Sequence, residues 1–344
     1  MALRETTGAK RLLDRDASAE AQTLAARAEA FYSLIRMRQG RPAEALRTAR
    51  TAVAEATMAH SNAALARAYG VMAWAYLMMD EPGAERLWLD ALTLYEKVGD
   101  LVGQGYMNNN LGGLAYFEGR WDEALEYYER SRDLAERLGN AVDIGVAEGN
   151  VGEVLVKQHK FDEAEPQLRR AVRVARASGD AFTVVFANLQ LARILIERGS
   201  YPEAEELLER SRDEAVSLDM KGPAYEAAIN LADLKARCGE PESALELLDR
   251  AEREAGDEAS IFAPTADRVR ALALASVGRN SEAVDVAGAA LDTARARSLD
   301  SEVAMLLLCQ ADLIEQEDAE SAAQLRAEGN AIVNRLDIRP LEPV

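Results

Sequence analysis

Carboxamide side chains recur at a fixed spacing through the middle of the chain. Asn110, Asn150, Gln190 and Asn230 are each 40 residues apart, and each directly precedes an apolar residue. A carboxamide both donates and accepts hydrogen bonds, so one ladder of amides can serve two purposes. The amides could fix the stacking of neighbouring repeats, or they could present donors and acceptors to a bound peptide.

The side chains around this ladder differ between copies, and specificity for a ligand is expected there. Three residues after the rungs come Gly113, Glu153, Arg193 and Asp233, and extra amides lie at positions 108 and 188. We predict that the following residues line a binding surface: Asn109, Asn110, Asn150, Glu153, Asn188, Gln190, Arg193, Asn230 and Asp233.

Few residues suit catalysis or metal binding. The two histidines, His60 and His159, are about a hundred residues apart, and His159 fills a turn position that other copies give to Gly. Cys238 and Cys309 lack any motif spacing and are expected to be packing thiols. The HExxH, CxxC, GxSxG and GxxxxGK[ST] patterns are absent. The sequence therefore predicts no catalytic residue, no metal and no cofactor, and the chain is expected not to be an enzyme.

A repeated sequence motif accompanies the amide ladder along the chain. It reads "GRPAEALR" at 40–47, "GRWDEALE" at 119–126 and "GSYPEAEE" at 199–206, with further copies between and after them. A period of 39 or 40 residues predicts a solenoid of supersecondary units. The small residue that marks the period recurs at Ala45, Ala84, Ala124, Ala164, Ala204, Ala244, Ala283 and Ala322.

Each repeat reads as two helices. Apolar residues recur with helical spacing on both sides of a turn, and a Gly such as Gly119 or Gly199 is expected to end the first helix. Pro or Asp then opens the second helix, as at Pro42 and Asp162. Nothing reads as a strand. We predict an all-α superhelix, a solenoid of about eight hairpins spanning residues 18–336, with repeats at 18–59, 60–99, 100–139, 140–179, 180–219, 220–257, 258–299 and 300–336.

The small residues of this code resemble the tetratricopeptide (TPR) motif. Gly112, Gly152, Ala192 and Ala232 lie 12 residues before the alanines of the second helices, which lets two backbones approach where the helices cross. The aromatic residues Trp121, Phe161 and Tyr201 recur at the same 40-residue spacing and are part of the resemblance. This resemblance implies that the first helices line a concave wall. The amide ladder, which lies on first helices, would then run along that wall.

Residues 94–155 are similar to a narrower group of TPR arrays. They resemble the C-terminal superhelix of bacterial, especially actinobacterial, signalling proteins in which class III adenylate/guanylate cyclase or LuxR-type domains join a STAND-type ATPase. The maltose-regulator sensor domain is a related array. The resemblance implies that the chain is a fragment of such a protein, with residues 1–17 a helical remnant and 337–344 a tail.

Composition restricts the partners. The formal charge of −19 opposes binding to nucleic acid or anionic lipid. The sequence contains no apolar run of 18 residues and no secretory h-region, so a cytoplasmic protein without a membrane span is expected. Charged residues at i,i+4 on second helices predict solvated faces, as in the pairs Glu126–Arg130, Glu206–Arg210 and Glu246–Arg250.

These patterns predict a protein-interaction and sensor module. A peptide, a partner domain or a small effector would bind the concave wall and report to attached domains through a change in superhelical pitch. The alternative is a structural scaffold or oligomerisation element with no ligand of its own. The polar last helix, with Glu320, Gln324 and Arg326, favours a monomer over a dimer.

Overall fold

The computed structural model describes residues 18–340, and within that range the chain is helical and contains no strand. Residues 1–17, expected to be a helical remnant, lie outside the described residues, as do residues 341–344. No helix of the described part combines the length and apolar character needed to cross a bilayer.

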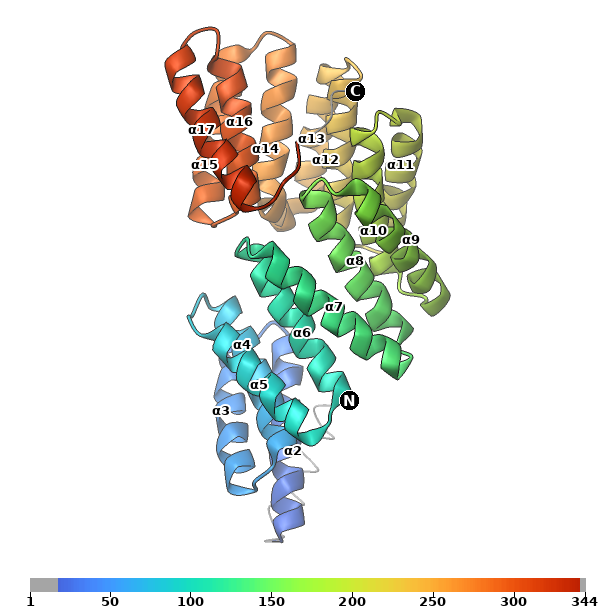
Figure 1. Ribbon diagram of the computed structural model, residues 1–344, viewed down its shortest axis with the longest axis vertical. Helices are drawn as coiled ribbons and strands as arrows, with labels where there is room; N and C mark the ends of the chain where they lie inside the picture. The colour runs from blue at the N-terminus through green and yellow to red at the C-terminus, as the bar shows by residue number, and fades with distance from the viewer. Residues whose placement is uncertain (1–17, 341–344) are drawn as a thin grey trace. The chain divides into compact units, whose positions relative to one another are not determined.

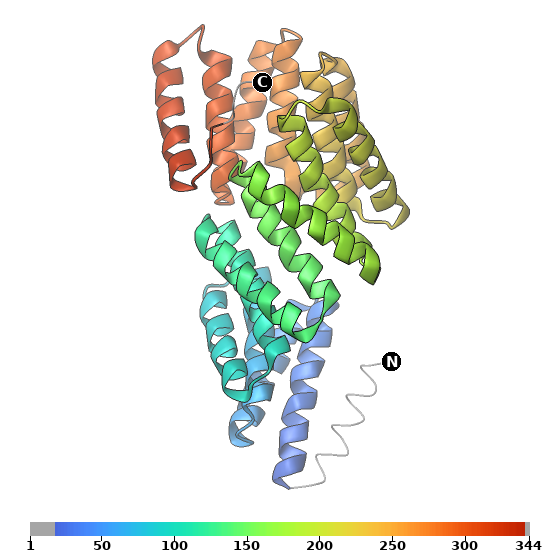
Figure 2. The ribbon, with the colours of Figure 1, turned by 45° about the vertical axis from the view of Figure 1, so that its right-hand side comes forward.

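The chain divides into two compact units (Figures 1 and 2). Unit 1 runs to Leu114 and takes in Glu126–Asn140, whereas unit 2 comprises Ala115–Leu125 and the residues from Ala141 onward. The helices of unit 1 are α2 (Ala19–Arg38), α3 (Pro42–Met58), α4 (Asn62–Met78) and α5 (Ala84–Val98). Both units draw on α6 (Leu101–Phe117) and α7 (Trp121–Leu138).

Unit 2 continues as five further hairpins, each a first helix followed by a second helix. They are α8 (Ala141–Lys157) with α9 (Phe161–Ser178), α10 (Ala181–Glu197) with α11 (Tyr201–Ser217), α12 (Lys221–Arg237) with α13 (Pro241–Ala255), α14 (Ala259–Ser276) with α15 (Asn280–Ala296), and α16 (Asp300–Ile314) with α17 (Ala319–Arg335). A 3₁₀ turn, η1 (Gly256–Glu258), joins α13 to α14.

The turns inside the hairpins follow the expected chemistry with one exception. Gly119 has a φ of 72°, and His159, in the equivalent place, has a φ of 55°, so both adopt the left-handed conformation that ends the first helix. Pro42 is the first residue of α3, as expected. Asp162, however, lies inside the first turn of α9 and is not its cap, because the N-cap is Lys160. Its carboxylate favours the helix through the helix dipole instead.

Small residues bring the two helices of a hairpin together in each unit. A Cβ atom on Gly152 would lie 2.4 Å from the side chain of Leu168, and one on Gly112 would lie 2.8 Å from the ring of Tyr128. Non-bonded atoms do not come so close to a real Cβ, so a larger residue at either position would force Leu168 or Tyr128 to shift. The cores that these crossings enclose contain Trp88 and Leu111 in unit 1, and Leu189, Leu208, Leu231 and Leu248 in unit 2.

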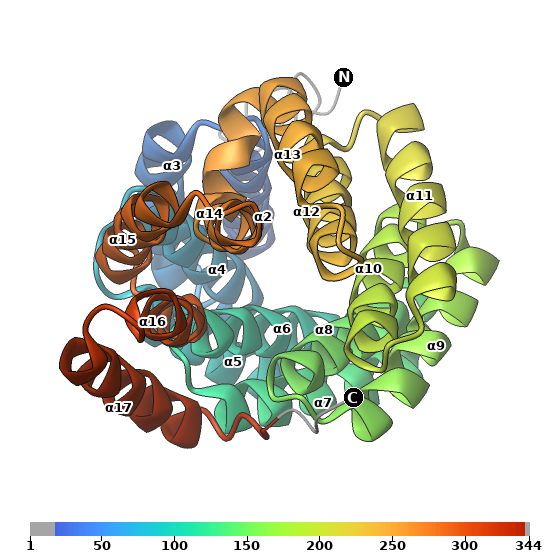
Figure 3. The same ribbon diagram turned by 90° about the horizontal axis from the view of Figure 1, so that it is seen from above.

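The first helices of unit 2 form a continuous inner layer. Each of α8, α10, α12 and α14 contacts the first helix of the next hairpin, ending at α16. Figure 3 shows α10, α14 and α16 on the inner side of this unit, with α9, α11 and α17 outside. Side chains on the first helices of consecutive repeats are therefore close neighbours, and a surface made of many repeats can form there.

Candidate functional site: the inner layer of unit 2

All of the predicted lining residues lie on first helices. Asn109 and Asn110 lie on α6, within unit 1. Those of unit 2 are Asn150 and Glu153 on α8, Asn188, Gln190 and Arg193 on α10, and Asn230 and Asp233 on α12. The structure thus brings the seven residues from Asn150 onward together on three adjacent helices of one unit.

The rung at Gln190 is part of the packing between repeats. Gln190 is fully buried, and its Nε2 donates to Oε1 of Glu226 on the next first helix at 3.4 Å. Asn188 is also buried. At this rung the geometry favours the stacking role of the amide, because neither side chain faces solvent.

The rungs on either side are more open. Asn150 and Asn230 are partly exposed, as are Asn109 and Asn110 in unit 1. The Nδ2 atom of Asn230 is itself buried and has no hydrogen-bond acceptor among residues 18–340. Asp233 is already engaged, because its Oδ2 lies 3.0 Å from Nε of Arg237. Of these rungs, Asn230 therefore offers the clearest free donor.

Charged side chains from five consecutive first helices converge beside the ladder. We call this set the inner charge cluster, and it balances three carboxylates with three cations. Its members are Glu153 and Lys157 on α8, Arg193 on α10, Glu226 on α12, Arg268 on α14 and Glu302 on α16.

Glu302 joins the two ends of the inner layer. Its Oε1 lies 3.0 Å from Nζ of Lys157, and its Oε2 lies 3.7 Å from Nε of Arg268. Burial alone would raise the pKa of Glu302, but the charges of Lys157 and Arg268, together with the hydrogen bond from Lys157, lower that pKa to about 2. Glu302 is therefore ionised at neutral pH and holds α8, α14 and α16 together.

The other two carboxylates are in the opposite electrostatic situation. Burial raises the pKa of Glu153 to about 7, with the nearby charge of Glu226 acting in the same direction and Lys157 opposing both. Tyr116 donates a hydrogen bond to Oε1 of Glu153 at 3.1 Å. Burial likewise raises the pKa of Glu226, against the charges of Arg193 and Lys157. Near neutral pH this side of the cluster can hold a proton.

Arg193 is the cation of the cluster with spare binding capacity. It is partly buried, and no carboxylate among the described residues lies within 4.0 Å of its guanidinium. It interacts with Glu153, Glu226 and Glu302 only at longer range. A guanidinium offers five donors in a fixed fork, so Arg193 can bind a carboxylate or a backbone carbonyl of a ligand.

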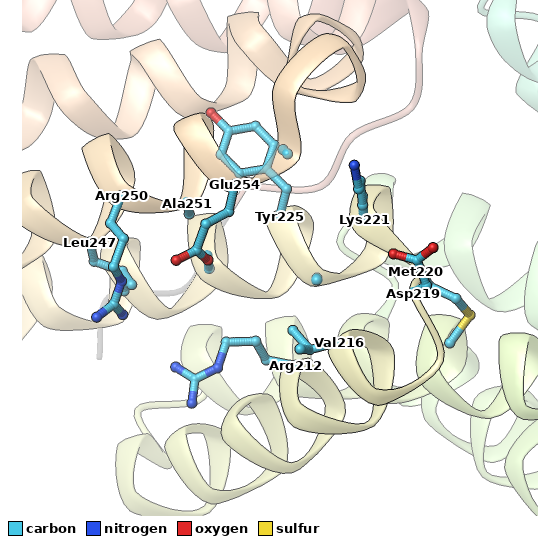
Figure 4. A pocket seen from close by; sticks show the side chains of 13 residues that line it. Arg212, Val216, Asp219, Met220, Lys221, Tyr225, Leu247, Arg250, Ala251 and Glu254 are labelled. Carbon is cyan, nitrogen blue, oxygen red and sulfur yellow. The ribbon is translucent and has the colours of Figure 1, made fainter.

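A second concave feature lies on the other side of the hairpins, between α11 and α13. Figure 4 shows Arg212 and Val216 of α11 facing Arg250 and Glu254 of α13 across a groove of about 280 Å³. Its floor is apolar, formed mainly by alanines of α12 and α13 with Tyr225. Burial raises the pKa of Tyr225 to about 12, so its hydroxyl stays protonated. The groove therefore combines an apolar floor with charged side chains at its rim.

The exposed faces of the second helices carry the expected ion pairs in two of three cases. Arg130 lies 3.1 Å from Glu126, and Arg210 lies 3.6 Å from Glu206. Arg250 at the rim of the groove does not pair with Glu246, and no carboxylate of the described chain lies within 4.0 Å of it. Such exposed pairs contribute little, about 0.3 kcal/mol each.

Sequence reasoning found Glu153 and Arg193 but missed the other four members of the cluster. Lys157, Arg268 and Glu302 are not in equivalent positions of the repeat, so the 40-residue period did not relate them. The available signal was a charged residue amid the apolar pattern of a first helix, as at Glu302 in "SEVAMLLL". That signal shows burial of a charge but does not identify its partner.

Comparison with known protein families agrees with this architecture. Tetratricopeptide repeat models match residues 104–177 and, separately, residues 187–210 and 225–250. The fold is a tetratricopeptide repeat solenoid. Its TPR hairpins are longer than the usual 34 residues, with a period of 39 or 40. No curated protein matches the chain.

Solved TPR structures with a similar fold include several Rap proteins. A Rap protein complexed with competence and sporulation factor is 17% identical, with 97% of each chain covered and a TM-score of 0.70. The Rap conjugation gene regulator of plasmid pLS20, in complex with the Phr* peptide, is 12% identical, with 90% of this chain and 95% of that chain covered and a TM-score of 0.55.

Aspartyl phosphate phosphatase F from Bacillus subtilis is 10% identical, with 93% of this chain and 97% of that chain covered and a TM-score of 0.53. At these identities the likeness shows a shared fold alone. Two of these three structures are of Rap proteins, whereas the sequence suggested the TPR arrays of cyclase, STAND-type and maltose-regulator proteins.

Proposed function

We propose that this chain is a binding scaffold of a bacterial regulatory protein, and that the inner layer of unit 2 holds a peptide or a peptide-like segment of a partner. The observation that carries the proposal is the inner charge cluster, in which Arg193 lies between three carboxylates and pairs with none of them within 4.0 Å. A partly buried, unpaired guanidinium is costly to keep unless a ligand uses it.

The ladder supplies neutral hydrogen bonds beside these charges. Asn230 offers a buried amide donor, and Asn150 is partly exposed two hairpins away. An extended peptide backbone carries donors and acceptors at regular intervals, which a row of amides matches. One structurally similar Rap protein was solved in complex with the Phr* peptide, which supports this choice over a small effector.

The wider context remains part of the proposal. The resemblance to arrays joined to cyclase or ATPase domains and the likeness to a Rap gene regulator both favour a signalling protein. We infer a role in binding rather than in catalysis, because the cluster offers ion pairs and amides without a nucleophile beside a base. The acidic composition argues against nucleic acid and membrane surfaces as partners.

A purely structural role is the second candidate, and a specific observation favours it. Gln190 is fully buried and hydrogen-bonded to Glu226, and Glu302 forms ion pairs with Lys157 and Arg268. If the whole inner layer served packing in this way, the chain would be a scaffold or oligomerisation element without a ligand.

Selection from a library of random short peptides on the purified chain distinguishes the two. We expect selected peptides to lose roughly tenfold or more in affinity on the Arg193→Ala and Asn230→Ala variants, because each removes a desolvated hydrogen bond. Arg210→Ala, an exposed arginine of α11, is the matched control and should bind as the wild type does. Equal affinity on all folded variants would favour the scaffold.

A further inference from the structure

The segment that follows α17 packs against the beginning of unit 2. Leu336 and Ile338 leave only 2% and 6% of their surface exposed, so two apolar anchors are buried after the last helix ends. Hydrogen bonds join this segment to Gln158, directly after the end of α8. We call residues 335–340 the C-terminal strap, and the surface under it is the turn between α8 and α9.

Backbone hydrogen bonds fix the register of the strap on this turn. The amide of Arg339 donates to the carbonyl of Gln158 at 3.0 Å, and Nε2 of Gln158 donates to the carbonyl of Leu336 at 3.3 Å. Nδ1 of His159 lies 2.8 Å from the carbonyl oxygen of Arg339, across 180 residues of sequence. The strap therefore has a defined seat.

Ion pairs surround the buried anchors. Lys160 lies 2.6 Å from Asp337, and Arg339 lies 2.8 Å from Glu163. Arg335, at the base of the strap, lies 2.6 Å from Asp300 of α16. Asp337, Arg339 and Glu163 are more than half exposed, so water competes for these pairs. Such a contact is specific but can be released.

Closure of this kind constrains the inner layer. A solenoid whose ends are free changes its curvature through small rotations at each interface between repeats. In unit 2 the last hairpin is tied to α8–α9 twice, by the strap outside and by the Lys157–Glu302 pair inside. Rotations at the repeat interfaces between α8–α9 and the last hairpin must then cancel one another, so the curvature of the inner layer cannot change while both ties hold.

We propose that the C-terminal strap is a latch that holds the inner layer of unit 2 closed over the inner charge cluster, and that the cluster becomes accessible when the latch releases. The strap is the occupant, in cis, of a docking seat formed by Gln158, His159, Lys160 and Glu163. The contacts between the strap and the α8–α9 turn support the latch itself. Only its role in ligand access rests on the proposed function.

The test uses the full chain with Ile338→Asp, which places a charge in an apolar seat and should free the strap. Ile338→Val, which keeps the anchor apolar, is the matched control. Hydrogen exchange of the Arg339 amide reports the seat directly. We expect slow exchange in the wild type and in Ile338→Val, and exchange faster by roughly tenfold or more in Ile338→Asp. Unprotected exchange in the wild type would refute the latch.

Zero-length carbodiimide cross-linking gives a second measure of closure. Lys160 and Asp337 should be joined within one chain in the wild type and in Ile338→Val, and not in Ile338→Asp. Mixing isotope-labelled with unlabelled chains separates this product from one formed between chains. Cross-linking that survives unchanged in Ile338→Asp, together with unchanged exchange, would show that Ile338 does not hold the strap and would contradict the latch.

Access to the cluster is measured without any ligand, by modification of arginine with phenylglyoxal. Arg193 should react roughly tenfold faster in Ile338→Asp than in the wild type, because chemical access follows local opening. Exposed Arg210 should react equally in both. If the strap is released and Arg193 reacts no faster, the latch does not control the cluster. That result would not bear on peptide binding by the inner layer, which the peptide selection tests separately.

Discussion

The two units build different surfaces from the same hairpin. In unit 1, α4 carries a single charged residue, Arg67, and leaves Trp74 and Met78 41% and 56% exposed. In unit 2, each of the first helices from α8 to α16 contributes a charge to one cluster. The repeat code therefore specifies how helices cross, whereas the remaining positions of the first helices specify the chemistry.

The crossings themselves show how similar the two frameworks are. Gly112 in unit 1 and Gly152 in unit 2 are 40 residues apart and meet the second helix in the same way. Their contacts differ, because Gly112 faces the ring of Tyr128 and Gly152 faces Leu168. The framework can therefore be tested separately from the charges.

Removing the charge of Glu302 should give the largest effect. Glu302→Gln leaves Lys157 and Arg268 without their carboxylate, and we expect the free energy of unfolding of unit 2 to fall by about 3–5 kcal/mol. Urea unfolding at neutral pH measures this loss. Because the folded pKa of Glu302 is lowered from 4.5 to about 2, its stabilisation is present above pH 4.5 and is lost as the pH falls toward 2.

The control for Glu302 is an exposed pair of the same unit. Glu328→Gln removes the partner of Arg295, whose side chain is 46% exposed, and should cost less than about 1 kcal/mol. Equal losses for the two variants would mean that the cluster does not stabilise unit 2.

Overpacking a crossing should come next. Gly152→Ala forces a Cβ atom against fully buried Leu168, and we expect a loss of about 2–3 kcal/mol in urea unfolding. Gly112→Ala, in unit 1, should cost less, about 1–2 kcal/mol, because its contact with Tyr128 is longer. The control is Gly105→Ala, whose Cβ would lie 3.9 Å from its neighbour and should be neutral or stabilising.

A smaller effect is expected at Glu153, with a characteristic pH dependence. The folded pKa of about 7 exceeds the ordinary 4.5, so the folded state binds more protons between these values and stability falls as the pH rises through them. Glu153→Gln removes that loss and should be more stable than the wild type by about 2 kcal/mol at pH 8, with little difference below pH 4.5.

Unfolding curves measured across this pH range test the prediction for Glu153. Glu126→Gln, on the exposed face of α7, should show no comparable trend. A constant difference between Glu153→Gln and the wild type would mean that Glu153 is ionised throughout the range, and that this side of the cluster holds no proton.

Local features of the fold were predictable because they depend on neighbouring residues. Hairpin turns at Gly119 and His159 follow from the need for a left-handed conformation after the first helix, and the crossing at Gly152 follows from the small-residue period. The amide ladder was predictable as a set, since its members share a position in the repeat. Its separate rungs were not, because Gln190 is buried and Asn230 is partly exposed.

The sequence alone determined the all-α solenoid, its period and the helices that carry the polar residues, because backbone preferences and apolar periodicity act over a few residues at a time. Tertiary structure decided that Lys157 meets Glu302 across 145 residues and that Leu336 and Ile338 return to the α8–α9 turn. These contacts depend on small rotations that accumulate from one repeat to the next. No single repeat encodes that sum, so only the folded array brings the two ends of unit 2 together.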